Sequence, residues 1–432
     1  MIIRKSGPLK GKFSIPGDKS ISHRAVMLGA LARGKTEINN FLMGDDCLST
    51  ISCFRKMGIH IEQDTEKKRV TVYGNGLDGL KPPKDSLYVG NSGTTIRLLS
   101  GILCGQTFSS LITGDASIKK RPMGRILVPL KQMEADIESI NHNDCAPLRI
   151  NGPKNHRLKG IHYNSPIASA QVKSCLLLAG LYADGETSVT EPALSRNHTE
   201  LMLSYFGADV KAAGNTVSIK PRPSLTGRKI NIPGDISSAA YLIAAALTVP
   251  HSEILIENVG INPTRDGILK VCTMMGADIE LINVKEDGGE PYADILVRHS
   301  NLKGIEIGGD IIPALIDEIP VIAVLACFAE GKTVIKDAGE LKVKESNRIE
   351  TTVRNLSAMG ADIYATEDGM VINGGKPLHG AVIDPKLDHR IAMAFSVAGL
   401  TADGETEILN PECVNISFPG FFEMVSGTVN KL

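Results

Sequence analysis

An apolar helix that ends in a strand beginning Gly-x-Thr recurs along the chain, with successive copies about 66 to 80 residues apart. The copies start at Gly34, Gly105, Gly185, Gly331 and Gly404, with a degenerate copy near His251. A regular period of this length indicates a supersecondary unit that is repeated six times.

A second helix lies within each repeat and ends at a second signature, typified by Met-Gly-Ala-Asp-Ile. The Gly in four of its five copies fits a helix C′ position before a strand. Alternating runs after the signature predict hairpins that turn at Gly214-Asn215 and Asp368-Gly369. Each repeat is therefore predicted to be βαβαββ. The signature occurs at residues 56–61, 132–137, 206–210, 275–279 and 359–363.

The chain consists of two related halves, because Lys12–Ser20 returns almost unchanged at residues 229–237, 217 positions later. We predict an α/β protein with two closed domains of three repeats each, and we weigh an open solenoid as the alternative. The predicted domains are residues 13–225, and residues 1–12 together with 226–432. The chain would cross between the domains near residues 11–13 and 223–229, where a two-strand hinge is expected.

The first copy of this segment predicts an anion-binding site. After a Pro-Gly turn, Lys19, Ser20 and Arg24 lie in the first turn of a helix, where backbone N–H groups lack intrahelical partners. The second copy keeps the shape but has Ile236 and Tyr241 in place of Lys19 and Arg24. A capped surface helix with solvated charges remains the alternative, although such a role would not require the first copy to be basic.

Polar residues also open the equivalent helices of other repeats. If these helices point the same way within closed domains, their polar ends converge on one face of each domain, and two such faces form a cleft. The cleft would hold several negative charges. The cations expected there are Lys19, Arg24, Arg97, Arg121, Arg196, Lys344, Arg348 and Arg390.

Two carboxylates, Asp317 and Glu345, would lie among these cations. Each is either an ion-pair partner or a general acid or base, and their joint presence in one basic cleft favours catalysis. No metal-ligand spacing and no Walker or dinucleotide glycine loop is found, so neither a metal nor a nucleotide cofactor is predicted.

Composition restricts the possible partners. A net charge of −1 and few aromatic residues argue against nucleic-acid or membrane binding. The eight cysteines occur singly, as expected of buried thiols in a reducing compartment. The N-terminus has no apolar signal segment and no apolar run is long enough to span a bilayer, so we expect a soluble, cytoplasmic protein.

Five motifs closely resemble those of the 5-enolpyruvylshikimate-3-phosphate synthase family, within the enolpyruvyl transferases. The motifs are Pro16-Gly-Asp-Lys-Ser, Gly90-Asn-Ser-Gly-Thr-Thr-Ile-Arg, Lys120-Arg-Pro-Met, Lys342-Val-Lys-Glu-Ser-Asn-Arg-Ile and Asp388-His-Arg-Ile-Ala-Met. The resemblance covers essentially the whole chain. It implies two domains of three βαβαββ units with the active site in the cleft between them, a result that agrees with the repeats.

The resemblance implies transfer of the carboxyvinyl group of phosphoenolpyruvate to the 5-hydroxyl of shikimate 3-phosphate, with release of phosphate. This is a step of the shikimate pathway of aromatic amino acid biosynthesis and the target of glyphosate. It implies no cofactor, and the family is usually monomeric. Asp317 would take the hydroxyl proton, while Glu345, together with Lys19, would protonate the methylene carbon.

The resemblance also implies two sets of binding residues. Shikimate 3-phosphate would be held by Lys19, Ser20, Arg24, Ser169, Gln171, Arg196, Asp317 and Lys344. Phosphoenolpyruvate would be held by Lys19, Gly93, Arg121, Gln171, Arg348 and Arg390.

Some positions depart from the enteric and plant branch of the family, since Leu98, Ala170 and Ile416 replace Pro, Ser and Lys. The response to glyphosate therefore stays open. Two other functions are weighed. One is the sister transferase that acts on UDP-N-acetylglucosamine, although the loop before Arg121 lacks its Cys. The other is an inactive anion-binding repeat protein, which would leave Asp317 and Glu345 without a role.

Overall fold

The structure is a computed structural model that describes residues 1–152 and 157–429. The chain forms two compact units, each described below by itself. The N-terminal unit comprises Gly17–Ile232 and Asp287–Glu290, and the C-terminal unit comprises Met1–Pro16, Pro233–Glu286 and Pro291–Leu432. The last three residues of the predicted second domain lie outside the described residues.

Three repeats build the N-terminal unit. The first has sheet order β14-β3-β5-β4, with β14 (Lys229–Asn231), β3 (Arg33–Asn39), β5 (Arg69–Asn75), β4 (His60–Asp64), α1 (Lys19–Leu31) and α2 (Asp45–Lys56). The second has order β6-β7-β9-β8, with β6 (Leu87–Tyr88), β7 (Ser110–Thr113), β9 (Leu148–Asn151), β8 (Asp136–Ser139), α3 (Gly93–Cys104) and α4 (Gly124–Gln132). The third has order β10-β11-β13-β12, with β10 (His162–Asn164), β11 (Thr187–Thr190), β13 (Thr216–Ile219), β12 (Val210–Ala213), α5 (Ala170–Gly180) and α6 (His198–Phe206).

Three repeats also build the C-terminal unit. The first has order β16-β17-β15-β2, with β16 (Asp278–Asp287), β17 (Glu290–Arg298), β15 (Glu253–Gly260), β2 (Lys10–Ser14), α7 (Ile236–Thr248) and α8 (Gly267–Met274). The second has order β18-β19-β21-β20, with β18 (Glu306–Ile307), β19 (Lys332–Ile335), β21 (Met370–Asn373), β20 (Asp362–Ala365), α9 (Ile312–Leu315), α10 (Ile319–Phe328) and α11 (Arg348–Ala358). The third has order β1-β23-β22, with β1 (Ile2–Ile3), β23 (Thr406–Ile408), β22 (Val382–Ile383), α12 (His389–Gly399) and α13 (Phe421–Val429).

The last repeat departs from the predicted pattern. Its sheet has three strands in the described structure, and the N-terminal strand β1 pairs antiparallel with β23 where the other repeats have a hairpin strand. This correction agrees with the sequence, because the second signature occurs in only five copies. The predicted hairpins are confirmed: Ala213 pairs with Thr216 across Gly214-Asn215, and Ala365 pairs with Met370 across a turn that contains Asp368-Gly369.

The crossing segments lie slightly later in the chain than predicted. Strand β2 precedes α1 but pairs parallel with β15, whereas β14 precedes α7 but pairs parallel with β3. Strand β2 therefore belongs to the C-terminal unit, although the helix after it, α1, belongs to the N-terminal unit. Strand β14 belongs to the N-terminal unit, although the helix after it, α7, belongs to the C-terminal unit. The predicted boundaries at 12/13 and 225/226 fall a few residues too early, because the units divide at the Pro-Gly turns after these strands.

Four helices end at the glycines that were predicted to occupy their C′ positions. Gly58, Gly207, Gly276 and Gly360 have φ values of 83°, 105°, 86° and 88°, in the left-handed region that closes a helix at little steric cost. Glu134 occupies the same place in the remaining copy with φ 62°. The signature thus marks a backbone conformation, which one repeat adopts without glycine.

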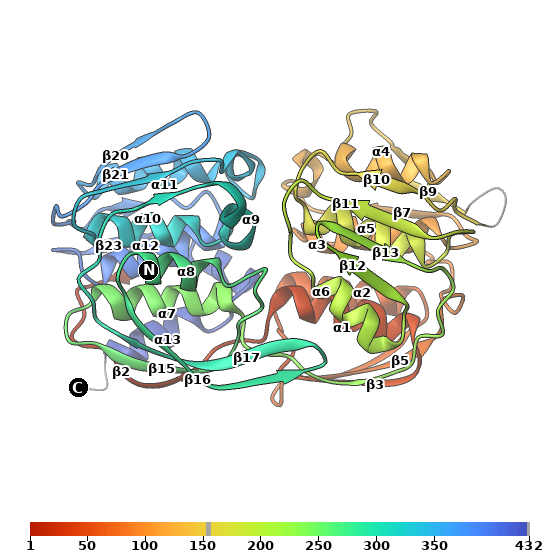
Figure 1. Cartoon of the computed structure of the whole chain (residues 1–432), viewed down its shortest axis with the longest axis horizontal. Coiled ribbons are helices and arrows are strands. Elements are labelled where there is room, and N and C mark those ends of the chain that lie inside the picture. Colours follow the sequence, from red (N-terminus) through yellow and green to blue (C-terminus); the bar gives the residue numbers. More distant parts are fainter. Residues whose placement is uncertain (153–156, 430–432) are drawn as a thin grey trace. The chain divides into compact units, whose positions relative to one another are not determined.

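Buried helices form the core of each unit and the sheets lie around them. In the C-terminal unit α7, α10 and α12 contact one another (Figure 1), and all residues of α7 are buried. In the N-terminal unit α3 packs against both α1 and α5, and α3 is buried along nearly its whole length. Helices that are apolar all round must lie inside. Polar side chains gather at the N-terminal turns of these helices, even where those turns are buried.

Within the described part of the chain, we find no single helix that is both long and apolar enough to cross a membrane. The segments Gly309–Leu315 and Ile319–Phe328 reach that composition only when taken together, and they meet at a bend of 110°.

Candidate active site

The predicted site residues fall into two clusters, one in each unit. The N-terminal cluster lies at the start of α1, α3 and α5, and the C-terminal cluster lies at the start of α10, α11 and α12. The members of the N-terminal cluster are Lys19, Ser20, Arg24, Gly93, Arg121, Ser169, Gln171 and Arg196. The members of the C-terminal cluster are Asp317, Lys344, Glu345, Arg348 and Arg390.

Lys19 begins α1, whose N-cap residue Asp18 accepts a hydrogen bond from the Ile21 N–H. Lys19 Nζ lies 2.5 Å from Asp46 Oδ2, and the two side chains are 16% and 7% exposed. Asp46 was missed by the sequence analysis. The available signal was Asp45-Asp46 in the first turn of the next helix, where acidic residues complement the helix dipole.

Arg24 is buried one turn further along α1. Its guanidinium donates to Thr199 Oγ1 at 2.6 Å, to Ser174 Oγ at 2.8 Å and to the Ser20 carbonyl at 3.0 Å. Burial lowers the pKa of Arg24 to about 10, although Glu200 and Asp18 act to raise it. Arg24 remains cationic at neutral pH, so it supplies a fixed positive charge beneath the start of α1.

Two guanidinium groups lie over Gly93 at the start of α3. A Cβ atom at position 93 would be 2.9 Å from Arg97 Nη1 and 3.1 Å from Arg121 Nη1. Arg97 Nη1 donates to Gln171 Oε1 at 2.6 Å, and Arg121 Nη2 donates to Asn91 Oδ1 at 2.7 Å. The absence of a side chain at Gly93 allows both arginines to approach the helix N-terminus, an arrangement suited to a phosphate or carboxylate.

Gly93→Ala is expected to weaken anion binding here, because the added methyl group displaces one or both guanidinium groups. Charge-assisted hydrogen bonds contribute ~1.5–3 kcal/mol each, so loss of one corresponds to roughly a tenfold or greater rise in KM for the anionic substrate that binds here. Steady-state kinetics measure this effect. Gly101→Ala is no suitable control, since its Cβ would meet backbone atoms of Cys175; Gly185→Ala, with open space around it, is the matched control.

A buried chain of hydrogen bonds lies behind the starts of α1 and α3. His23 Nδ1 is 2.7 Å from Thr50 Oγ1, Thr50 is 2.7 Å from Thr95 Oγ1, and Thr95 donates to Ser92 Oγ at 2.7 Å. Burial lowers the pKa of His23 well below its ordinary value, and the charges of Lys19 and Arg24 lower it further against a smaller opposing effect of Asp18. His23 is therefore neutral at neutral pH.

The free energy of unfolding is expected to fall in acid because of His23. With its folded pKa depressed, the unfolded state binds a proton below pH ~6.5 and the folded state does not, so this contribution is present above the unfolded pKa and is lost as pH falls. Denaturant titrations are expected to show that His23→Gln loses about 1 kcal/mol less than the wild type between pH 6.5 and 5.5. His162→Gln, at an exposed position, serves as the control; equal slopes in all three proteins would contradict the assignment.

Ser169 and Gln171 begin α5. Ser169 is the N-cap residue but makes no capping bond with its side chain, and its backbone N–H donates to Glu191 Oε1 at 2.7 Å. Gln171 bridges α5 to α3 through Arg97 and Thr94. Arg196 is half-buried in the segment before α6, where its charge lowers the pKa of Arg24. Hydrogen bonds thus join the N-terminal turns of α3 and α5.

Arg348 connects the C-terminal cluster. Its side chain is 1% exposed and reaches Asp317 Oδ1 at 3.1 Å, Glu345 Oε2 at 2.6 Å and Asp388 Oδ2 at 2.8 Å. Burial acts to lower the pKa of Arg348, but the three carboxylates, Asp388 first, raise it well above its ordinary value. Asp388 also caps α12 by accepting from the Arg390 N–H at 3.0 Å. Arg348 and α12 are therefore held by the same carboxylate.

Asp317 lies among three cations. Besides Arg348, Lys344 Nζ is 3.6 Å from Asp317 Oδ1 and Arg390 Nη2 is 3.9 Å from Asp317 Oδ2. Arg390 also lies 3.5 Å from the fully buried Glu318. Burial opposes the charge on Arg390, yet Asp317, with further help from Tyr241 and Glu318, raises its pKa. Cations and carboxylates are interleaved here, so a bound anion would compete with these carboxylates for the arginines.

In the second, non-basic copy of the Pro-Gly-Asp motif, the polar side chains at the start of the helix bond to other residues of the C-terminal unit. At the start of α7, the Ser237 hydroxyl donates to Glu318 through a short hydrogen bond, and Arg265 donates to Ser237 at 2.5 Å. Asp235 accepts from the Ser237 N–H, as Asp18 does for Ile21 in the first copy. The second copy therefore keeps the helix cap and joins α7 to the Glu318–Arg390 pair.

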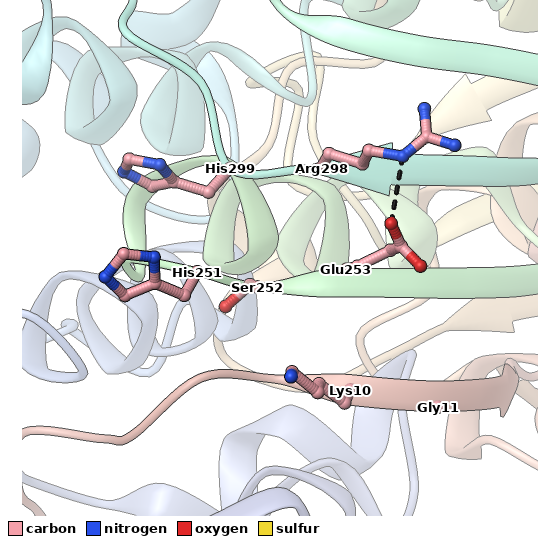
Figure 2. A pocket seen from close by; sticks show the side chains of 7 residues that line it. All are labelled: Lys10, Gly11, His251, Ser252, Glu253, Arg298 and His299. Atoms are coloured by element: carbon pink, nitrogen blue, oxygen red, sulfur yellow. Dashed lines mark hydrogen bonds and ion pairs between the residues drawn. The ribbon is translucent and has the colours of Figure 1, made fainter.

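A surface pocket lies at the edge of the β15, β17 and β2 sheet in the C-terminal unit (Figure 2). Figure 2 shows His251 and His299 on one side and the Arg298–Glu253 ion pair, at 3.0 Å, on the other. Burial, with a contribution from His251, lowers the pKa of His299. None of the predicted site residues lines this pocket. Its lining residues are Lys10, Gly11, His251, Ser252, Glu253, Arg298 and His299.

Among the described residues, no group of three or more His, Cys, Asp or Glu side chains is placed to hold a metal ion. The charged residues of both clusters are instead dominated by arginine and lysine, side chains that bind anions.

The chain is similar to known proteins over its whole length. A model of the family described as EPSP synthase (3-phosphoshikimate 1-carboxyvinyltransferase) matches residues 3–425. The chain is 55% identical over 429 residues to the 3-phosphoshikimate 1-carboxyvinyltransferase of Desulforamulus reducens, covering 99% of each chain. It is 58% identical over 421 residues to that of a Thermoanaerobacter species, covering 98% of each chain. A solved structure of EPSP synthase from Acinetobacter baumannii is similar with a TM-score of 0.88 and 48% identity, covering 99% of this chain and 97% of that one.

Proposed function

Because the chain belongs to the EPSP synthase family, the 3-phosphoshikimate 1-carboxyvinyltransferases, we propose that it transfers the carboxyvinyl group of phosphoenolpyruvate to the 5-hydroxyl of shikimate 3-phosphate and releases phosphate. The family assignment confirms the resemblance seen in the sequence. The alternative acting on UDP-N-acetylglucosamine is not favoured, because the relatives that match over the full length carry the 3-phosphoshikimate name.

We propose that the substrates bind the two sets of residues that the resemblance implies. Shikimate 3-phosphate would contact Lys19, Ser20, Arg24, Ser169, Gln171, Arg196, Asp317 and Lys344. Phosphoenolpyruvate would contact Lys19, Gly93, Arg121, Gln171, Arg348 and Arg390. Two contacts support the second set: Arg97 and Arg121 approach Gly93 at the start of α3, and Gln171 is tied to Arg97.

The observation that supports the catalytic roles most directly is that Arg348 contacts both Asp317 and Glu345. The surrounding cations favour Asp317 as a carboxylate, the form that a general base needs to accept the proton of the attacking 5-hydroxyl. The C–O bond then forms as the methylene carbon gains a proton, and the tetrahedral adduct regains its C=C bond by losing one methyl proton and the phosphate group. Glu345 and Lys19 are the candidate donors, and binding of phosphoenolpyruvate to Arg348 would release Glu345 from its ion pair.

Phosphate release from phosphoenolpyruvate, assayed with shikimate 3-phosphate and with UDP-N-acetylglucosamine in parallel, tests the proposed function. We expect release with shikimate 3-phosphate only. Release with UDP-N-acetylglucosamine alone would reverse the assignment. Binding of shikimate 3-phosphate without any turnover would instead favour an inactive anion-binding protein.

We also propose that the protein acts as a monomer in the cytoplasm. All eight cysteines are free, and seven of them are buried, so the fold does not depend on an oxidising compartment. Gel filtration with light scattering measures the oligomeric state.

A further inference from the structure

Lys173 is a buried charge that the proposed chemistry does not use. It lies on α5, one turn after Ser169, and its side chain is 2% exposed. Its ammonium group is 2.9 Å from Glu191 Oε2 and 2.8 Å from Glu200 Oε1, and both carboxylates are buried. A buried charge is tolerated when it is paired and hydrogen-bonded, and removing one partner leaves the other uncompensated.

Glu191 connects this ion pair to two segments of the proposed shikimate 3-phosphate site. One oxygen, Oε1, accepts from the Ser169 N–H at 2.7 Å, and the other, Oε2, accepts from the Ser195 hydroxyl at 2.7 Å. Lys173 itself donates to the Ser195 carbonyl at 3.2 Å. Ser195 immediately precedes Arg196. The buried Lys173–Glu191 pair is therefore hydrogen-bonded both to the backbone of Ser169 and to the residue before Arg196.

The contact with Glu191 also fixes the position of Ser169 for a ligand. Glu191 fixes the backbone of this N-cap residue, while the Ser169 side chain makes no capping bond. A hydroxyl at a helix N-terminus suits a phosphate dianion, and the segment held by the same Glu191 continues into Arg196, whose guanidinium is a second group of that kind. Lys173 also offsets part of the negative charge of Glu191 and Glu200, which would otherwise repel that dianion.

We propose that Lys173 is a positioning residue for the phosphate end of shikimate 3-phosphate: through Glu191 it fixes Ser169 and Arg196, and through its charge it offsets Glu191 and Glu200. This inference rests on the proposed function. It differs from a purely structural role because it predicts a defect confined to one substrate, and to the phosphate group of that substrate.

The test compares Lys173→Met with Leu177→Ala, a fully buried apolar position on the same helix. We expect Lys173→Met to raise KM for shikimate 3-phosphate at least tenfold while KM for phosphoenolpyruvate stays within about twofold. Calorimetric titration is expected to show the same loss for shikimate 3-phosphate but no loss for shikimate, which lacks the phosphate. Leu177→Ala is expected to lower the melting temperature without changing either KM.

Ser195→Ala keeps the proposal testable if Lys173→Met does not fold, because it removes one hydrogen bond to Glu191 and leaves the ion pair intact. We expect a severalfold rise in KM for shikimate 3-phosphate alone. Equal changes in both KM values, or equal losses of shikimate and shikimate 3-phosphate binding, would overturn the proposal. A wild-type protein without turnover would count against the proposed function instead, so the two failures are distinct.

Discussion

Replacing Asp317 by asparagine is expected to lower kcat by at least ~10²-fold, the loss typical of a missing general base. Asparagine keeps the size and one acceptor oxygen of Asp317 but cannot take a proton from the 5-hydroxyl. Substrate affinity is expected to stay within about tenfold, because Arg348, Lys344 and Arg390 remain in place. Phosphate release at saturating concentrations of both substrates measures kcat.

Removal of a carboxylate from a cationic cluster also changes the local charge, so a control must do the same without touching the proposed base. Glu340→Gln meets this requirement, since Glu340 lies 3.3 Å from Lys344, the same ammonium group that faces Asp317. We expect Glu340→Gln to retain most of the wild-type kcat. If Asp317→Asn retains it as well, Asp317 is not the base.

Local patterns predicted the repeats because each repeat is specified within a short stretch. Glycines at helix ends, hairpin turns and apolar helices depend on near neighbours in sequence, and the positions of Gly58, Gly207, Gly276 and Gly360 confirm this. The exchange of β2 and β14 between the units was not predictable in the same way. It depends on which distant strand each one pairs with, and Lys12–Ser20 and residues 229–237 are nearly identical in sequence.

The cations of the candidate site could be predicted, but only some of their partners could, since Asp46 and Asp388 were not among the expected carboxylates. Charged residues in the first turn of a helix stand out in a sequence, as Lys19, Arg348 and Arg390 do. Asp46 and Asp388 stabilise those cations from other helices, and nothing local to Lys19 or Arg348 specifies the pairing. Lys173 is a further example, because the sequence shows a lysine at the start of an apolar run, whereas its partners Glu191 and Glu200 lie 18 and 27 positions further along the chain.

Lys19→Met is expected to produce the largest loss of activity. Lys19 is proposed to contact both substrates and to take part in protonation of the methylene carbon. Loss of a charge-assisted hydrogen bond costs ~1.5–3 kcal/mol and loss of acid catalysis costs ~10²-fold, so kcat/KM is expected to fall by at least ~10³-fold. Coupled phosphate-release kinetics, with direct titration of phosphoenolpyruvate binding, measure the two contributions.

Asp46 allows the electrostatic part of this loss to be separated from the chemical part. In Lys19→Met, Asp46 loses an ion pair of 2.5 Å, and its carboxylate then faces the incoming anions. The double variant Lys19→Met/Asp46→Asn removes that repulsion, so we expect it to recover part of the phosphoenolpyruvate affinity but none of the turnover. Recovery of turnover in the double variant would show that Lys19 acts only by neutralising Asp46 and would remove it from the protonation step.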